Sequence, residues 1–179
     1  MPTTVVNLYA GPGAGKSTTA AGVFSLLKLH GVNAELVTEF AKDLTWEGSQ
    51  AVLANQDYVL GQQYHRLWRL NGKVDIIVTD SPLLLSLVYG DTSNWRFVHY
   101  VESLYSNFNN VNYFIERVKP YQEAGRNQTE DEARDLDRSI RDMLDSRVVT
   151  YDVVPGDISG INTIVQDLVR YQQFLLTGS

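Results

Sequence analysis

The chain has 179 residues, a length that fits one domain over residues 1–179 with a sizeable hydrophobic core. Its formal net charge of −6 disfavours a surface made for bulk nucleic-acid binding, and its lack of cysteine excludes disulfides and thiolate metal sites. No apolar run reaches the length of a membrane span, and the N-terminal residues lack the pattern of a secretion signal. We therefore expect a cytoplasmic protein without a membrane partner.

The first predicted strand and helix flank a glycine-rich loop. Residues 4–9 form an apolar run with β-branched side chains, which predicts a buried strand, and apolar spacing predicts a helix over 17–30. Between them stands AGPGAGKS, residues 10–17, which fits a phosphate-binding loop. Its glycines allow backbone angles that other residues resist, so successive N–H groups can face an anion. The following helix adds its positive N-terminal dipole.

A loop of this kind predicts ATP and Mg²⁺ as cofactors. Lys16 would reach the β- and γ-phosphates, and the Ser17 hydroxyl would bind Mg²⁺. The structural alternative is a glycine-rich turn with a chance Lys-Ser pair, which the flanking strand and helix disfavour. The predicted nucleotide-binding residues of this segment are Gly11, Pro12, Gly13, Ala14, Gly15, Lys16, Ser17 and Thr18.

An acidic residue follows the second predicted strand, which covers residues 33–38. Ligands of open parallel sheets bind beyond the carboxyl ends of the strands, so Glu39 would lie beside the phosphate-binding loop. Glu39 is a candidate catalytic residue, either as a base or as a ligand to metal or substrate. The alternative is an acid in the first turn of a helix, where the helix dipole favours it.

A long helical pattern over residues 50–70 carries candidates for substrate binding. Polar groups near one stripe could hydrogen-bond a base or amide edge, and the polar flank of an amphipathic helix is an equally good explanation. Trp46, Tyr58 and Trp68 could stack on a planar substrate, but aromatic residues at such spacing are more often core. The candidate substrate residues are Gln56, Gln63 and Arg66.

The third predicted strand, residues 73–80, is apolar enough to be buried on both faces and ends in Asp80. A carboxylate at that point can hold Mg²⁺ or accept a proton from an attacking hydroxyl. Asp80 is therefore a candidate metal ligand and catalytic residue, and either it or Glu39 would be the base. The alternative is a capping aspartate ahead of the helix predicted over 82–89.

The rest of the chain continues the alternation of helix and strand. Helices are predicted over 95–108, 130–147 and 161–176, and strands over 111–116 and 148–154. Such an alternation predicts an α/β fold, with a parallel sheet that is covered by helices on both faces and joined by right-handed crossovers.

The least regular stretch is RVKPYQEAGRNQT, residues 117–129, an excursion from the sheet. A mobile arginine can meet the negative charge that phosphoryl transfer spreads over the equatorial oxygens. Arg126 stands beside a glycine that suits the hinge of a closing lid, so it is a candidate catalytic residue. Arg117 and Arg134 are candidate nucleotide ligands. The alternative is a solvated charged helix whose arginines pair with neighbouring acids.

Four segments together resemble the small P-loop kinases of the nucleoside and nucleotide kinase type: AGPGAGKST, VTEFAKDL, DIIVTDSPLLLSLVYG and RVKPYQEAGRNQTEDEAR. In particular, the chain is similar to the nicotinamide riboside kinase-like group, an AAA-type group that is frequent in bacteriophage genomes. The resemblance implies a three-layer P-loop NTPase sandwich. Its five-stranded parallel sheet would have the order 2-3-1-4-5, with a lid at about residues 117–134. By analogy, the turn PGDISG would pass near the adenine.

The resemblance also implies ATP-dependent transfer of the γ-phosphate to a hydroxyl or phosphate of a nucleoside- or nucleotide-like acceptor, in the host cytoplasm if the protein is phage-encoded. Two alternatives stay open. Some phage enzymes of this broad kind phosphorylate 5-hydroxymethyluracil within DNA. A duplex substrate needs a basic face, which the acidic composition of this chain does not indicate. A P-loop ATPase switch is the other, although TDSPLL lacks the Asp-Glu pair typical of such motors.

Overall fold

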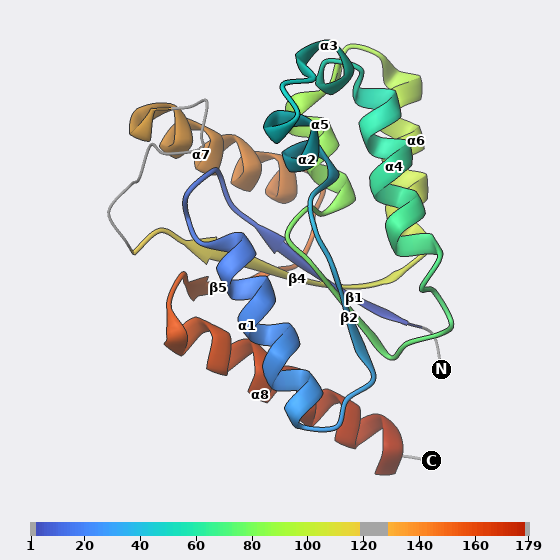
Figure 1. Cartoon of the computed structure of the whole chain (residues 1–179), viewed down its shortest axis with the longest axis vertical. Coiled ribbons are helices and arrows are strands. Elements are labelled where there is room, and N and C mark those ends of the chain that lie inside the picture. Colours follow the sequence, from blue (N-terminus) through green and yellow to red (C-terminus); the bar gives the residue numbers. More distant parts are fainter. Residues whose placement is uncertain (1–2, 119–128, 178–179) are drawn as a thin grey trace.

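Five parallel strands form a sheet in the order β2-β3-β1-β4-β5, which confirms the predicted topology (Figure 1). The computed structural model describes residues 3–118 and 129–177. The strands are β1 (Thr4–Tyr9), β2 (Ala34–Val37), β3 (Ile76–Thr79), β4 (Asn109–Glu116) and β5 (Asp152–Pro155). The helices are α1 (Lys16–Leu29), α2 (Phe40–Trp46), α3 (Gln50–Leu53), α4 (Gln56–Trp68), the 3₁₀ turn η1 (Leu83–Leu85), α5 (Ser86–Tyr89), α6 (Trp95–Ser106), α7 (Glu130–Ser146) and α8 (Ile158–Thr177).

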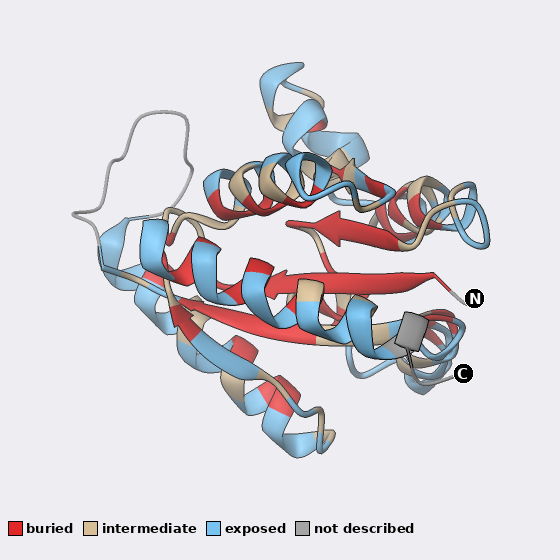
Figure 2. Cartoon of the chain, turned by 90° about the horizontal axis from the view of Figure 1, so that it is seen from below, coloured by how far each residue is buried: buried red, intermediate tan, exposed pale blue. Residues whose placement is uncertain are grey.

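Helices cover both faces of the sheet and complete the three-layer sandwich. α1 and α8 pack on one face, where their apolar side chains meet those of β1 and β3. The other face is covered by α4, η1, α5, α6 and α7, which pack against the alternate side chains of the same strands. Figure 2 shows the buried strands between these layers. Over the described residues, no helix is both long and apolar enough to cross a membrane.

The two central strands are buried along their whole length, which explains their continuous apolar sequences. All six residues of β1 and all four of β3 are buried. Pairing of Thr4 with Ile76 and with Asn109 sets the register, so the carboxyl ends of the strands meet at one edge of the sheet. The P-loop (residues 10–17), Glu39 and Asp80 follow β1, β2 and β3 at that edge.

The region after β2 is more broken than the sequence pattern predicts. Residues 40–46 form α2, a helix that the sequence offers only as the alternative interpretation of Glu39, and the predicted helix over 50–70 is two helices, α3 and α4. The side chain of Asn55 interrupts it by accepting a hydrogen bond of 3.2 Å from the backbone N–H of Tyr58, which caps α4. Apolar periodicity continues across the break and therefore does not reveal it.

β5 begins at Asp152, later than the predicted start at residue 148. The preceding residues belong to the end of α7: the backbone N–H groups of Val148 and Val149 donate to the carbonyls of Asp145 and Leu144, each at 3.0 Å. Val148 also has a positive φ of 55°. Hydrogen bonds that close the helix and a left-handed backbone keep these residues out of the sheet.

The turn after β5 packs directly against the back of the P-loop. A Cβ on Gly156 would lie 2.3 Å from the Ala14 carbonyl oxygen, so we expect Gly156→Ala to destabilise the fold by ~1–3 kcal/mol through overpacking. Gly61→Ala in α4 is the matched control, because a Cβ there meets no atom of the described residues within 4 Å and alanine is the better helix former. Thermal unfolding of both variants checks this, and equal midpoints would contradict it.

Candidate active site

The P-loop has the backbone of an anion-binding loop. Gly13 and Gly15 adopt positive φ values of 77° and 107°, and Gly15 is the N-terminal cap residue of α1. The Lys16 ammonium lies over the loop, where it donates to the carbonyls of Ala10 at 2.6 Å and Gly11 at 3.3 Å. The N-terminus of α1 and a lysine therefore face the same space, which suits a phosphate group.

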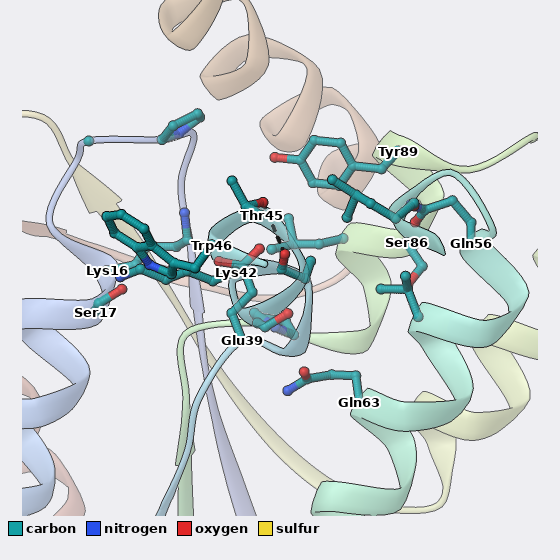
Figure 3. Close-up of a pocket in the computed structure, with 18 of the residues that line it drawn as sticks. Lys16, Ser17, Glu39, Lys42, Thr45, Trp46, Gln56, Gln63, Ser86 and Tyr89 are labelled. Carbon is teal, nitrogen blue, oxygen red and sulfur yellow. Dashed lines mark hydrogen bonds between the residues drawn. The ribbon is translucent and has the colours of Figure 1, made fainter. Parts of the chain in front are cut away.

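A cavity of about 540 Å³ extends from the P-loop toward α2, α4 and α5. This volume is in the usual range for small-molecule sites. P-loop residues, including Lys16 and Ser17, line one end of the cavity, and Gln56 and Tyr89 line the other, with Glu39 between them (Figure 3). The predicted residues Pro12, Gly13, Gly15 and Thr18 also line it, while Gly11 and Ala14 are buried behind the loop.

Asp80 lies at the carboxyl end of β3 and is 3% exposed. Its Oδ1 atom is buried and has no hydrogen-bond partner within the described part of the chain. The capping alternative does not hold, because neither η1 nor α5 receives a side-chain cap. A buried carboxylate oxygen without a partner is costly, which indicates that a ligand or water completes the site.

The residues around Asp80 fit Mg²⁺ bound together with phosphates. Mg²⁺ keeps several waters and usually takes only one or two protein ligands beside the phosphate oxygens. The exposed Ser17 hydroxyl at the start of α1 and the Asp80 carboxylate offer such a set. Residues 3–118 and 129–177 contain no cluster of three or more His, Asp or Glu side chains that could hold a metal by themselves. The phosphates would therefore supply further oxygen ligands to Mg²⁺.

Glu39 is the N-cap residue of α2, but its side chain makes no capping hydrogen bond to the helix. Burial raises the pKa of Glu39, the nearby Asp80 raises it further, and Lys16 partly opposes both. Burial likewise lowers the pKa of Lys16, against the attraction of Glu39 and Asp80. The two acids therefore flank the P-loop lysine, and Glu39 has the raised basicity that suits a general base.

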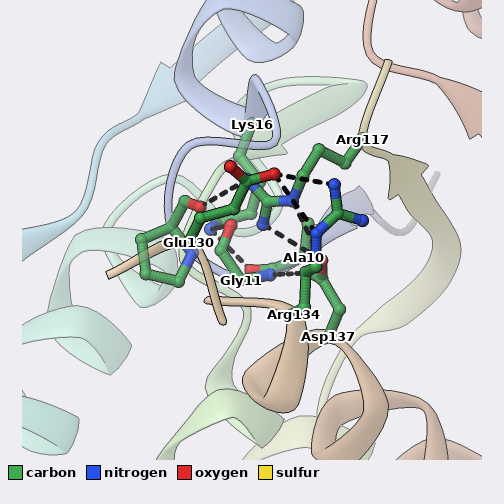
Figure 4. Close-up of polar contacts among 8 residues, drawn as sticks. Ala10, Gly11, Lys16, Arg117, Glu130, Arg134 and Asp137 are labelled. Carbon is green, nitrogen blue, oxygen red and sulfur yellow. Dashed lines mark hydrogen bonds and ion pairs between the residues drawn. The ribbon is translucent and has the colours of Figure 1, made fainter. Parts of the chain in front are cut away.

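The two described arginine candidates make contacts with different partners (Figure 4). Arg117 is nearly buried, pairs with Asp137 at 3.0 Å and donates to the Pro12 carbonyl at 2.8 Å. Arg134 forms an i,i+4 pair with Glu130 at 2.7 Å, and both side chains are about half exposed, as the surface-pair alternative expects. Arg126 and most of the predicted lid lie outside the described residues.

The polar stripe of α4 mainly supports the segment that carries Glu39. Gln63 is buried, accepts from the Phe40 N–H at 3.0 Å and donates to the Thr38 carbonyl at 3.4 Å, although it also lines the cavity. Arg66 donates to the same carbonyl and pairs with Asp43 at 2.7 Å, and it does not line the cavity. Of the three candidates, only Gln56 lines the cavity without a hydrogen bond to residues 38–43 in the described part of the chain. Its amide donates to the Leu53 carbonyl instead.

Several cavity residues are not predicted by the sequence pattern. Ser86 and Tyr89 stand three positions apart after Asp80, a helical spacing that could have indicated a shared face. Tyr89 is 46% exposed, and partial burial, with Glu39 and Asp137 nearby, raises its pKa to about 12, so its phenol stays a hydrogen-bond donor. The sequence does not decide whether Trp46 stacks on a substrate or belongs to the hydrophobic core. Its side chain is 73% exposed and lines the cavity, which excludes the core.

Comparisons with known proteins agree with the fold. The AAA domain family matches residues 5–160, and curated protein sequences give no match. Thymidylate kinase from Ehrlichia chaffeensis is 13% identical with a TM-score of 0.57, covering 97% of this chain and 100% of that one. Deoxyadenosine kinase from M. mycoides, solved with dATP, is 15% identical with a TM-score of 0.55, covering 94% and 99%. The chain belongs to the AAA domain family and shares the P-loop fold of these two kinases.

Proposed function

We propose that this protein is an ATP-dependent kinase that transfers the γ-phosphate to a hydroxyl of a nucleoside-like small molecule. The observation that carries the proposal is one cavity in which a partly buried acid, Glu39, lies close to the lysine of a phosphate-binding loop. Relatives of the same fold act on a nucleotide and a nucleoside, which supports an acceptor of that class.

The residues that line the cavity, together with the buried Asp80 next to its wall residue Ser81, divide into roles. The P-loop N–H groups and Lys16 would bind the triphosphate and meet charge that develops on the transferred group. Ser17 and Asp80 would hold Mg²⁺, which when bound neutralises phosphate charge. Glu39 would orient the acceptor hydroxyl and accept its proton as the oxygen attacks the γ-phosphorus, while the leaving oxygen stays on ADP.

A hydroxyl acceptor fits the cavity better than a phosphate acceptor. Among the described residues that line it, only Lys16 and Lys42 are basic, and Lys16 belongs to the P-loop end. Recognition of a second phosphate usually relies on arginine forks or several cations. Glu39 would also repel a phosphate brought next to it. The neutral polar groups of Gln56 and Tyr89 suit an uncharged acceptor instead.

The test is conversion of ATP to ADP with Mg²⁺ against a panel of acceptors. The panel holds nucleosides, nucleoside monophosphates, nicotinamide riboside, and DNA with and without 5-hydroxymethyluracil. We expect turnover to be slow with ATP alone and to rise with one nucleoside-like compound. Brisk hydrolysis without an acceptor would favour the ATPase switch, and stimulation only by modified DNA would favour the DNA kinase. Stimulation only by monophosphates would overturn the hydroxyl assignment.

A further inference from the structure

An aspartate of α7 is hydrogen-bonded to the backbone of the P-loop. The Asp137 Oδ1 atom accepts from the Gly11 N–H at 2.6 Å, and its Oδ2 atom accepts from Arg117 Nη2 at 3.0 Å (Figure 4). Arg117 Nη1 in turn donates to the Pro12 carbonyl at 2.8 Å. Two side chains from separate elements thus bind consecutive residues of the loop. We refer to Arg117 and Asp137 as the Arg–Asp clamp.

The backbone packing shows that this contact is built into the fold. A Cβ on Gly11 would lie 2.5 Å from the Ala133 carbonyl oxygen and 2.9 Å from Asp137 Oδ1, so only glycine lets α7 come this close to the loop. The side chains of Arg117 and Asp137 are 5% and 19% exposed. Water therefore screens this pair far less than the exposed pairs of the same helix.

The negative charge of Asp137 lies beside the P-loop, and the positive charge of Arg117 neutralises it. A carboxylate that binds the P-loop lies next to the site proposed for a triphosphate, and like charges at short range in a partly buried place repel strongly. The Asp137 charge raises the pKa of Lys16, and Arg117 acts on that pKa with the opposite sign. The guanidinium thus offsets a negative charge that would otherwise weaken anion binding at this loop.

We propose that Arg117 is a positioning residue, whose charge neutralises Asp137 so that α7 can hold the P-loop without repelling the nucleotide. The sequence suggests a different role, in which Arg117 binds phosphate itself. The proposal rests on the proposed function, because it concerns binding of ATP. The two roles predict different results. Only in the positioning role does the effect of removing Arg117 on ATP affinity depend on whether Asp137 carries its charge.

The experiment is a double-mutant cycle read by isothermal titration of Mg²⁺-ATP. The variants are Arg117→Ala, Asp137→Asn and the double variant; asparagine keeps an acceptor for the Gly11 N–H while removing the charge. The matched control is the cycle of Arg138→Ala and Asp135→Asn, an exposed pair on the same helix that makes the same charge changes. Thermal unfolding without nucleotide verifies that every variant is folded.

We expect Arg117→Ala to weaken ATP binding at least about tenfold, since it leaves a partly buried charge without its neutralising partner. Adding Asp137→Asn should restore most of this loss, and Asp137→Asn alone should bind at least as tightly as the wild type. The control cycle should change affinity little. Restoration also separates positioning from a merely structural role, because removing a second structural contact would not recover affinity.

Three results would overturn the inference. A double variant as weak as Arg117→Ala would mean that Arg117 contacts phosphate directly or only supports the structure, and that it does not act by neutralising Asp137. An Arg117→Ala protein that binds ATP like the wild type would mean that the clamp has no such role, while the proposed function stands. A wild-type protein that binds no ATP at all would overturn the proposed function and this inference together.

Discussion

Replacing Lys16 by alanine is expected to lower the rate of acceptor phosphorylation by about 10²–10³-fold, the usual cost of losing one charged donor to the transferred group. The physical reason is the position of its ammonium, which the carbonyls of Ala10 and Gly11 hold over the P-loop. No other residue of the loop carries a positive charge. The measurement is ADP formation with the acceptor that the panel identifies, at saturating and at low ATP.

Lys28→Ala is the matched control for this variant. Lys28 lies in the last turn of the same helix, α1, and is exposed at the end away from the P-loop, so its loss removes the same charge without touching the cavity. We expect the control to keep the wild-type rate. A Lys16→Ala protein that retains wild-type turnover would show that the phosphates bind elsewhere and would remove the basis of the kinase proposal.

Replacing Glu39 by glutamine is expected to lower kcat by about 10²–10⁴-fold, the usual contribution of a positioned base, with a smaller effect on the KM for the acceptor. Glutamine keeps the size of the side chain and a hydrogen-bonding oxygen but cannot take a proton. Glu35→Gln is the control, because Glu35 is an exposed carboxylate on β2, only four residues earlier. If Glu39→Gln keeps the wild-type kcat, Glu39 is not the base.

The pH dependence of the wild-type enzyme tests the same assignment. A base acts only when deprotonated, and the pKa of Glu39 is raised by burial, so activity should fall as pH decreases through a range above that of an ordinary glutamate. The acid limb should appear in kcat/KM, which reports the free enzyme. An acid limb at the ordinary glutamate position, or the same limb in Glu39→Gln, would contradict the role of Glu39.

The sequence was sufficient for the parts of the site that come from strand ends. In an open parallel sheet, residues just after neighbouring strands share one edge, so the pattern of strands alone predicts that the P-loop, Glu39 and Asp80 lie together. The Asp80 oxygen is buried and has no hydrogen-bond partner among residues 3–118 and 129–177, and η1 and α5 have no side-chain cap, which together favour a ligand role over capping. Strand positions follow from apolar runs, and their order comes from the resemblance to P-loop kinases.

Prediction from the sequence was least reliable where one local pattern is compatible with more than one structure. Residues 50–70 have helical periodicity throughout, yet Asn55 caps a new helix within them. Gln63 and Arg66 hydrogen-bond the backbone of Thr38 and Phe40, and of the two only Gln63 also lines the cavity among the described residues. A polar side chain on a helix is equally able to bind a substrate or a neighbouring loop, and the choice depends on which element packs opposite.

The sequence by itself determined the fold class, the phosphate-binding loop and the two acids beside it, because glycine content, apolar periodicity and strand endings are local properties. Only the tertiary structure decided what surrounds them. Asp137 reaches the P-loop from 126 positions away, Gly156 fits behind Ala14, and Tyr89 and Trp46 join one cavity. Such contacts depend on how helices pack against the sheet, and packing sums many weak interactions that no single stretch of sequence specifies.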